Sequence, residues 1–154
     1  MLRLLVASIF FISLQAAGEN CPELPQSIET AIFKHINKIR AYEYCDARLI
    51  ESSHNRTIVI YTAEGECNEN TEQPPGSCSN NWARYMIGEY SGRLIAPVLI
   101  GGKGNFTDHE IMSTGNEIKI SGVTVGSEDG LCCPTVPQTK AFRVADNGFE
   151  EFPP

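Results

Sequence analysis

The densest group of chemically distinctive residues is the stretch at 127–135, which reads Ser-Glu-Asp-Gly-Leu-Cys-Cys-Pro-Thr. It places two adjacent cysteines, Cys132 and Cys133, between an Asp129-Gly130 pair and Pro134. Glycine takes positive φ and aspartate bonds nearby backbone, so the pair predicts a turn, while proline favours an extended residue before it. We therefore expect the two cysteines to lie in a connection between two strands.

Two kinds of chemistry are open to these cysteines. Neighbouring cysteines bond to each other only through a strained ring, and strained bridges are the labile, functional ones, so a Cys132–Cys133 bond would suit a redox site. However, the pair lacks C-x-x-C spacing, and no thioredoxin-like alternation of strands and helices surrounds it. A structural staple is the interpretation we favour.

The even number of cysteines predicts a disulfide framework in an exported chain. The six cysteines are Cys21, Cys45, Cys67, Cys78, Cys132 and Cys133. Pairing neighbours in sequence gives Cys21–Cys45, Cys67–Cys78 and Cys132–Cys133. The alternative crosses the last pair to the first and needs no strained ring.

The end of the chain resembles a known group of sequences. Asp129, the run from Cys132 to Thr135, residues 139–144 and Asn147-Gly148-Phe149 are similar to the end of uncharacterised bacterial secreted or periplasmic proteins. Those proteins end in a D-x-x-C-C-P-[ST] turn and a last β-hairpin. The resemblance covers the last third of the chain and implies export. It also implies a Cys132–Cys133 bond, because these can be a member's only cysteines, but it implies no activity.

The beginning of the chain has the features of a secretory signal peptide. Arg3 precedes an apolar run from Leu4 to Leu14, and Ala16-Ala17-Gly18 offers small residues for cleavage. The run is too short to span a bilayer comfortably, which disfavours the alternative of a retained membrane anchor. We therefore expect a signal peptide at 1–18, a single domain at 19–154 and a secreted or periplasmic location, with no membrane span after cleavage.

The charge of the chain limits its partners. Nineteen acidic residues against twelve basic ones give a formal net charge of −7. This acidity argues against nucleic acid and anionic membrane surfaces, which attract basic proteins. An unknown protein or small molecule is the partner that remains.

One amphipathic helix is predicted near the start of this domain. Apolar residues recur at spacings of three and four, which marks one helical face, and they indicate a helix over 25–39. They are Leu24, Ile28, Ala31, Ile32, Ile36 and Ile39. His35 lies among polar residues and is expected to be solvated.

From residue 41 the pattern favours short strands joined by turns. Strands are expected at 42–50, 57–62, 82–90, 94–100, 111–112, 118–125 and in a final hairpin around Asp146-Asn147-Gly148. A change of apolar phase predicts a β-bulge at Gly122. The predicted class is α+β, with one N-terminal amphipathic helix packed on an antiparallel meander of about six or seven strands, stapled by disulfides.

Recognisable catalytic and metal-binding patterns are missing from the sequence. Histidines are far apart, and Asp108-His109-Glu110, the densest ionisable cluster, is expected in a solvated loop. No Ser-His-Asp arrangement or phosphate-binding glycine loop is recognisable. We therefore expect no catalytic residues, no metal site, no cofactor and no enzymatic activity.

The long polar loop at 64–79 gives the leading functional hypothesis. Loops of this length are functional or disordered, and a disulfide across it favours order. Its four glutamates lack the regular spacing of a calcium loop. We expect a non-catalytic binding or interaction domain of the cell envelope that uses this loop. The alternatives are a thiol/disulfide redox protein or enzyme using Cys132-Cys133, and a purely structural envelope protein.

Overall fold

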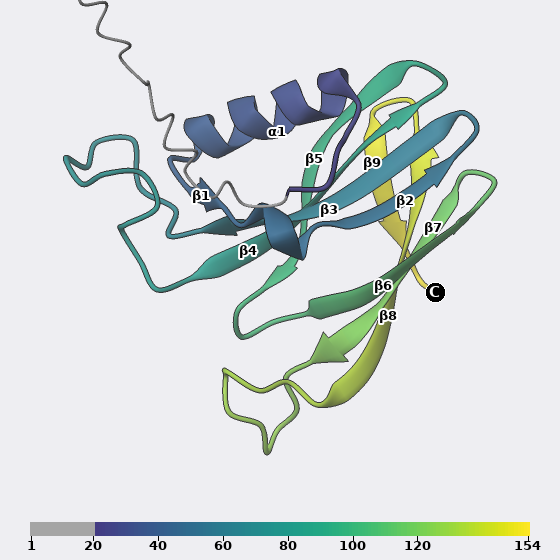
Figure 1. Cartoon of the computed structure of the whole chain (residues 1–154). Coiled ribbons are helices and arrows are strands. Elements are labelled where there is room, and N and C mark those ends of the chain that lie inside the picture. Colours follow the sequence, from purple (N-terminus) through teal and green to yellow (C-terminus); the bar gives the residue numbers. More distant parts are fainter. Residues whose placement is uncertain (1–20) are drawn as a thin grey trace, which may run out of the picture.

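The computed structural model describes residues 21–154, so the predicted signal peptide at 1–18 lies outside the described residues. Within this range the chain forms three layers (Figure 1): one α-helix, a five-stranded sheet and a four-stranded sheet. All strand pairs are antiparallel. The expected antiparallel fold with one helix and disulfides is therefore present.

Helix α1 (Gln26–Lys38) covers one face of the first sheet. Its apolar face is the predicted one, because Ile28, Ile32 and Ile36 recur every four residues and are all buried. They pack on Val59 and Tyr61 of the central strand. This contact seals the outer face of the sheet and leaves the opposite face for the second sheet.

The first sheet is built around β3, with β4 and then β5 on one side and both β1 and β2 on the other. The bounds are β1 (Tyr42–Glu43), β2 (Leu49–Ser53), β3 (Arg56–Glu64), β4 (Trp82–Tyr90) and β5 (Arg93–Gly102). The single strand expected over 42–50 is wrong, because a short 3-10 helix, η1 (Cys45–Ala47), interrupts it.

The second sheet consists of four strands in sequence order. They are β6 (Thr107–Thr114), β7 (Glu117–Thr124), β8 (Val136–Ala145) and β9 (Gly148–Phe152). The last hairpin turns at 146–147, where the sequence predicts it. In contrast, the loop expected at Asp108-His109-Glu110 is wrong, because these residues belong to β6.

The prediction of one meander of about six or seven strands is too simple, since residues 21–154 form nine strands in two sheets. The reason lies in β3, which buries side chains on both faces. Its odd-numbered residues meet the helix, whereas Ile58 and Ile60 meet Phe106, Ile118 and the rest of the second core. A sheet that is apolar on both faces needs a layer on each.

The predicted β-bulge is present on the partner strand instead. The register shifts between Asp108 and Glu110 of β6, opposite Gly122 of β7. A Cβ atom at Gly122 would collide with the carbonyl oxygen of Thr107 and lie 2.6 Å from the ring of Phe106. The glycine is therefore needed for close approach of the bulged strand, while its own pairing to β8 stays regular.

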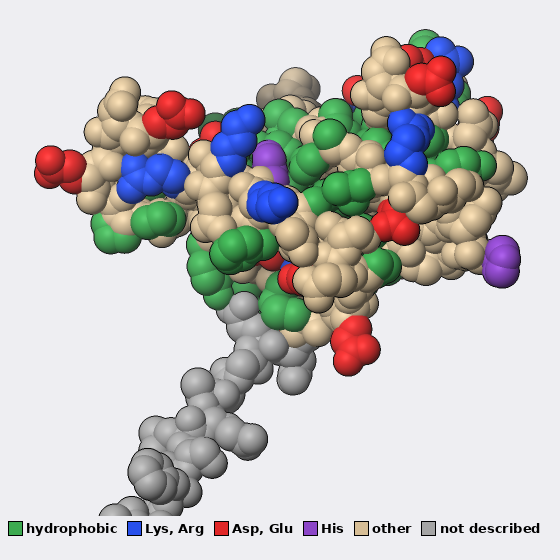
Figure 2. Space-filling view, turned by 90° about the horizontal axis from the view of Figure 1, so that it is seen from above, with side chains coloured by type: hydrophobic (Ala, Val, Ile, Leu, Met, Phe, Trp, Pro, Cys, Tyr) green, Lys and Arg blue, Asp and Glu red, His purple; other side chains and the backbone are tan. Residues whose placement is uncertain are grey.

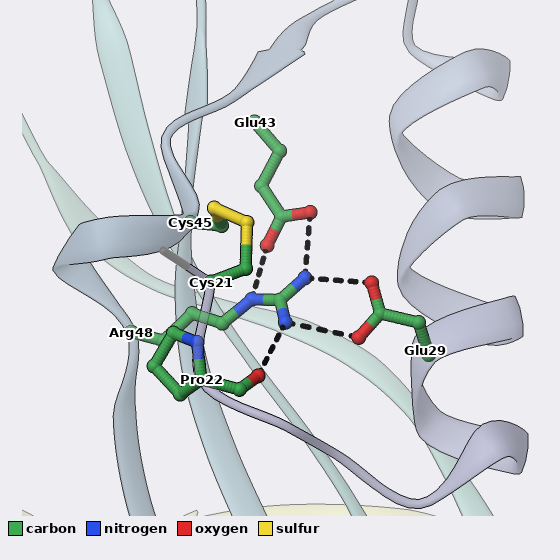
Figure 3. The surroundings of a disulfide bond; sticks show 6 residues. All are labelled: Cys21, Pro22, Glu29, Glu43, Cys45 and Arg48. Carbon is green, nitrogen blue, oxygen red and sulfur yellow. Dashed lines mark hydrogen bonds and ion pairs between the residues drawn. A yellow bond between two sulfur atoms is a disulfide. The ribbon is translucent and has the colours of Figure 1, made fainter. Parts of the chain in front are cut away.

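The cysteines are paired as neighbours in sequence: Cys21–Cys45, Cys67–Cys78 and Cys132–Cys133. The first bridge lies beside the buried guanidinium of Arg48, which Glu43 and Glu29 hold from two sides (Figure 3). Burial alone would lower the pKa of Arg48, but hydrogen bonds from Arg48 to Glu43 and Glu29 raise it above its usual value. Bridge and ion pairs together tie the N-terminal segment to η1 and the helix.

Candidate functional site

A pocket of about 330 Å³ lies between the two sheets, next to η1 and the start of β4. Both sheets contribute to it, so its shape depends on how they pack. Its lining residues are Tyr44, Ala47, Leu49, Thr62, Glu64, Trp82, Arg84, Thr107 and Asp108. Pockets that combine aromatic walls with a few polar groups are the usual form of ligand sites.

A buried ion pair between the sheets forms part of the lining. Arg84 of β4 donates from Nε to Asp108 Oδ1 (2.7 Å) and from Nη2 to Asp108 Oδ2 (2.6 Å). Its Nη1 donates to the backbone carbonyl of Ala47 (2.9 Å) and to Thr62 Oγ1 (2.5 Å). Each charge is thus neutralised by the other, and the guanidinium joins both sheets and η1 in one network.

Two lining residues, Glu64 and Trp82, belong to an aromatic–carboxylate–aromatic row across three strands. Glu64 of β3 lies directly opposite Trp82 of β4 and opposite Tyr42 of β1. Residues paired across antiparallel strands point to the same face, so the three side chains share the face away from the helix. The carboxylate of Glu64 makes no hydrogen bond or ion pair within the range 21–154, whereas the backbone of Glu64 is part of the ladders to both neighbouring strands.

The long loop, residues 65–81, emerges beside this row, because it begins after Glu64 and ends before Trp82. In Figure 2 it projects at the left of the molecule and carries acidic side chains. Arg40 orders it by donating to three of its backbone carbonyls, those of Asn68 (3.2 Å), Thr71 (2.5 Å) and Gln73 (2.6 Å).

The cysteine turn connects β7 to β8 and is shaped by Asp129. Its carboxylate accepts the backbone N–H of Gly126 and both the N–H and the hydroxyl of Thr135, each at 2.8 Å. These bonds to Gly126 and Thr135 lower the pKa of Asp129. The Asp and Thr of the D-x-x-C-C-P-[ST] pattern therefore close the loop, and Cys132 and Cys133 are exposed on it.

The structure places the predicted site residues in three separate regions. The Cys21–Cys45 bridge lies at the N-terminal segment, Cys67–Cys78 in the long loop and Cys132–Cys133 in the last turn, and no cysteine lines the pocket. No group of histidine, cysteine, aspartate and glutamate side chains in the described part of the chain is arranged to hold a metal ion.

The expectation of a solvated His35 is wrong. Its Nδ1 shares a hydrogen bond with the hydroxyl of Tyr61 (2.7 Å). Its ring also packs in an edge-to-face arrangement with the ring of Tyr85, with 4.6 Å between the centroids. Burial and then the charge of Lys38 lower the pKa of His35. The helical spacing alone does not predict these contacts of His35, because Tyr61 lies in β3 and Tyr85 in β4.

Sequence reasoning missed the pairing of Arg84 with Asp108. A signal was present, because Arg84 lies two residues before Met86 on the same face of a predicted strand. An arginine on the core-facing side of a strand needs a buried acidic partner. The choice of Asp108 could not be read from the sequence, since it lies in the other sheet.

No family model, curated protein or solved structure matches this chain. Within residues 21–154, no helix is long and apolar enough to cross a membrane. The class of protein therefore has to be argued from the fold, the disulfides and the pocket.

Proposed function

We propose that the protein is an exported, non-catalytic binding domain of the cell envelope, which holds a group of its partner in the pocket between the sheets. The observation that carries this proposal is the position of Trp82, the only tryptophan of the chain. It lines the pocket half-buried, beside the exposed ring of Tyr44. Aromatic rings at concave, partly exposed positions are typical anchors of binding sites.

The long loop supports the same location for binding. Its two ends join Glu64 and Trp82, which both line the pocket, so the loop begins and ends at the pocket. Arg40 and the Cys67–Cys78 bridge hold the loop in one shape. A preformed loop loses less conformational entropy on binding, which favours affinity.

A binding role fits the pocket better than a catalytic one. Acid–base catalysis needs a side chain that is free to exchange a proton with the substrate. Among the charged lining residues, Arg84 and Asp108 use their polar atoms on each other and on Thr62 and Ala47, which leaves the carboxylate of Glu64 without a second acid or base to work with. This pairing suits a fixed scaffold for the pocket.

Export is supported by the three disulfides, which persist in oxidising compartments. A secreted or periplasmic location, a signal peptide at 1–18 and membership of the bacterial group with the D-x-x-C-C-P-[ST] ending are parts of the same proposal. For the last of these, the support is that Asp129 and Thr135 of the pattern close the cysteine turn by hydrogen bonds in this chain.

A matched pair of substitutions tests the binding proposal. Ala47→Phe adds a ring inside the pocket, and Ala96→Phe adds the same ring on the exposed surface of β5. The mature protein and both variants are immobilised and exposed to the exported proteins of the native source. Capture of a partner by the native chain and by Ala96→Phe, with loss in Ala47→Phe, is expected. Equal capture by both variants would contradict the pocket as the contact site.

Replacement of residues 66–79 by a short glycine linker, which removes both Cys67 and Cys78 and keeps Glu64, tests the loop in the same assay. Weaker capture is expected, because the linker removes the ordered contacts next to Trp82. Unchanged capture would limit the proposal to the pocket itself. Thermal unfolding of each variant serves as the control for intact folding.

A thiol/disulfide role for Cys132–Cys133 is the second candidate function. Both cysteines are exposed, and Asp129 closes their loop through contacts that do not involve the sulfur atoms. Reduction would therefore leave the loop anchored, as a reversible redox site requires. Titration of the pair with a dithiol buffer tests this role. Resistance to reduction under conditions that reduce exposed bridges would argue against it.

A further inference from the structure

We infer that the pocket selects an arginine side chain of a protein partner. This inference rests on the proposed binding function and gives its ligand a chemical class. It starts from Glu64, the one lining carboxylate that the fold does not use. The other lining carboxylate, that of Asp108, forms the ion pair with Arg84.

The surroundings of Glu64 suit a cation. Trp82 lies directly across the strand pair from it, and Tyr42 lies on the other side. A cation is attracted to aromatic faces, most strongly to tryptophan, and forms a charge-assisted hydrogen bond with a carboxylate. A neutral or anionic group would leave Glu64 desolvated without a partner, which is costly.

The charges around the pocket agree with this choice. Arg84 cannot attract an anion, because it is paired bidentately with Asp108. The loop at 65–81 has three glutamates and no lysine or arginine. Two cations beside it, Arg40 and Lys103, donate to its backbone carbonyls, and the four carboxylates of Glu64 and the loop outnumber them. A positively charged partner would therefore be steered to this end of the molecule.

Arginine fits this arrangement better than lysine. Its guanidinium is flat, so it can stack on the indole of Trp82 while its N–H groups bond the carboxylate of Glu64 in a fork. The pocket, at about 330 Å³, lies at the lower end of the range for ligand sites and is suited to one inserted side chain.

The single tryptophan allows a direct test with three short peptides. Acetyl-Gly-Arg-Gly-amide, its lysine analogue and its citrulline analogue are titrated into the mature protein while the fluorescence of Trp82 is recorded. Citrulline keeps the length and plane of arginine but has no charge. A saturable change is expected for the arginine peptide, with affinity at least about tenfold higher than for citrulline.

Two variants with the same change of charge locate the effect. Glu64→Gln is expected to weaken arginine binding by about tenfold, whereas Glu72→Gln, at an exposed position of the loop that follows β3, changes it by less than about twofold. Equal losses of affinity for the arginine peptide in both variants would overturn the inference. The attraction would then come from the overall negative charge of this end of the molecule and not from a contact with Glu64.

The outcomes separate this inference from the proposed function. Equal binding of the arginine and citrulline peptides would overturn cation selection and leave pocket binding intact. Absence of any arginine-dependent change of Trp82 fluorescence would also overturn it, whereas loss of partner capture in Ala47→Phe concerns the proposed function alone.

Discussion

At the scale of single residues, Arg84 and Asp108 set the geometry of the pocket. They lie in different sheets, and their side chains are almost fully buried, with 7% and 0% of their surface exposed. A buried ion pair contributes little compared with an apolar pair of similar size, but removing one partner leaves an uncompensated charge. The contribution of the pair to stability is therefore measured by removing one of the two residues, which leaves the other charge buried without a partner.

Asp108→Ala is expected to lower the free energy of unfolding by about 3–5 kcal/mol, because Arg84 then stays buried without its carboxylate. Urea unfolding of the variant measures this loss. The double variant Arg84→Met/Asp108→Leu is the control and should recover most of the stability. A loss below about 1 kcal/mol in the single variant would show that Arg84 reaches water without it.

Asp129 gives the cysteine turn a dependence on pH. Its hydrogen bonds from Gly126 and Thr135 lower its pKa in the folded protein. A group with a lowered folded pKa stabilises the fold above its unfolded pKa of about 3.9, and this contribution is lost as the pH falls through the folded pKa.

We therefore expect the Thr135 backbone amide to be protected at neutral pH, measured as its exchange rate relative to that of an unprotected amide at the same pH. This protection should be lost in acid, as the pH falls through the lowered folded pKa of Asp129. Hydrogen exchange read by NMR measures this change. Asp129→Asn should show fast exchange of Thr135 across the whole range. Protection of Thr135 that is independent of pH would contradict this role of Asp129.

At the scale of elements, the closeness of β6 and β7 depends on Gly122. The carbonyl oxygen of Thr107 and the ring of Phe106 occupy the space where its Cβ would lie. Gly122→Ala is expected to cost about 1–3 kcal/mol of unfolding free energy, as other overpacked positions do. Gly130→Ala is the control, since only the sulfur of Cys132 approaches its Cβ position, at 3.5 Å. Equal stability of the two variants would contradict this packing.

The element pattern also shows where local sequence information ends. The helix and β4 are predictable from their local periodicity, and β3 from a local run of β-branched residues. The break between β1 and β2 was not predicted. It lies where Cys45 is bonded to Cys21 and where Arg48 pairs with Glu43, and both contacts are made within the folded chain.

At the scale of the whole molecule, the division into two sheets could not be predicted from the strands alone. It depends on β3 being apolar on both faces and on the chain crossing between sheets after Gly102. The candidate site depends on the same step, because Arg84 and Asp108 meet only when the sheets are stacked. The long loop was predicted from sequence at 64–79 and lies at 65–81 in the structure, but its position at the rim of a pocket was not predicted.

The three disulfides should differ in their effect on global stability. A bridge stabilises mainly by restricting the unfolded chain, and the effect grows with the loop that it closes. The sequence separations are 24 for Cys21–Cys45, 11 for Cys67–Cys78 and 1 for Cys132–Cys133.

Serine at both positions of either long-range bridge is therefore expected to cost about 2–5 kcal/mol, and serine at 132 and 133 less than about 1 kcal/mol. Chemical denaturation of the three double variants makes the comparison. A large loss from the 132/133 variant would show that its loop supports the core.

The central claim is that the pocket between the sheets is where this protein binds. Its most direct test is a fragment screen by NMR, in which the single indole N–H signal of Trp82 reports on the pocket. We expect binding fragments to shift this signal together with the amides of Thr62 and Thr107, and to do so in Ala96→Phe but not in Ala47→Phe. Fragments that leave Trp82 unchanged and shift the turn at 125–135 instead would contradict the claim.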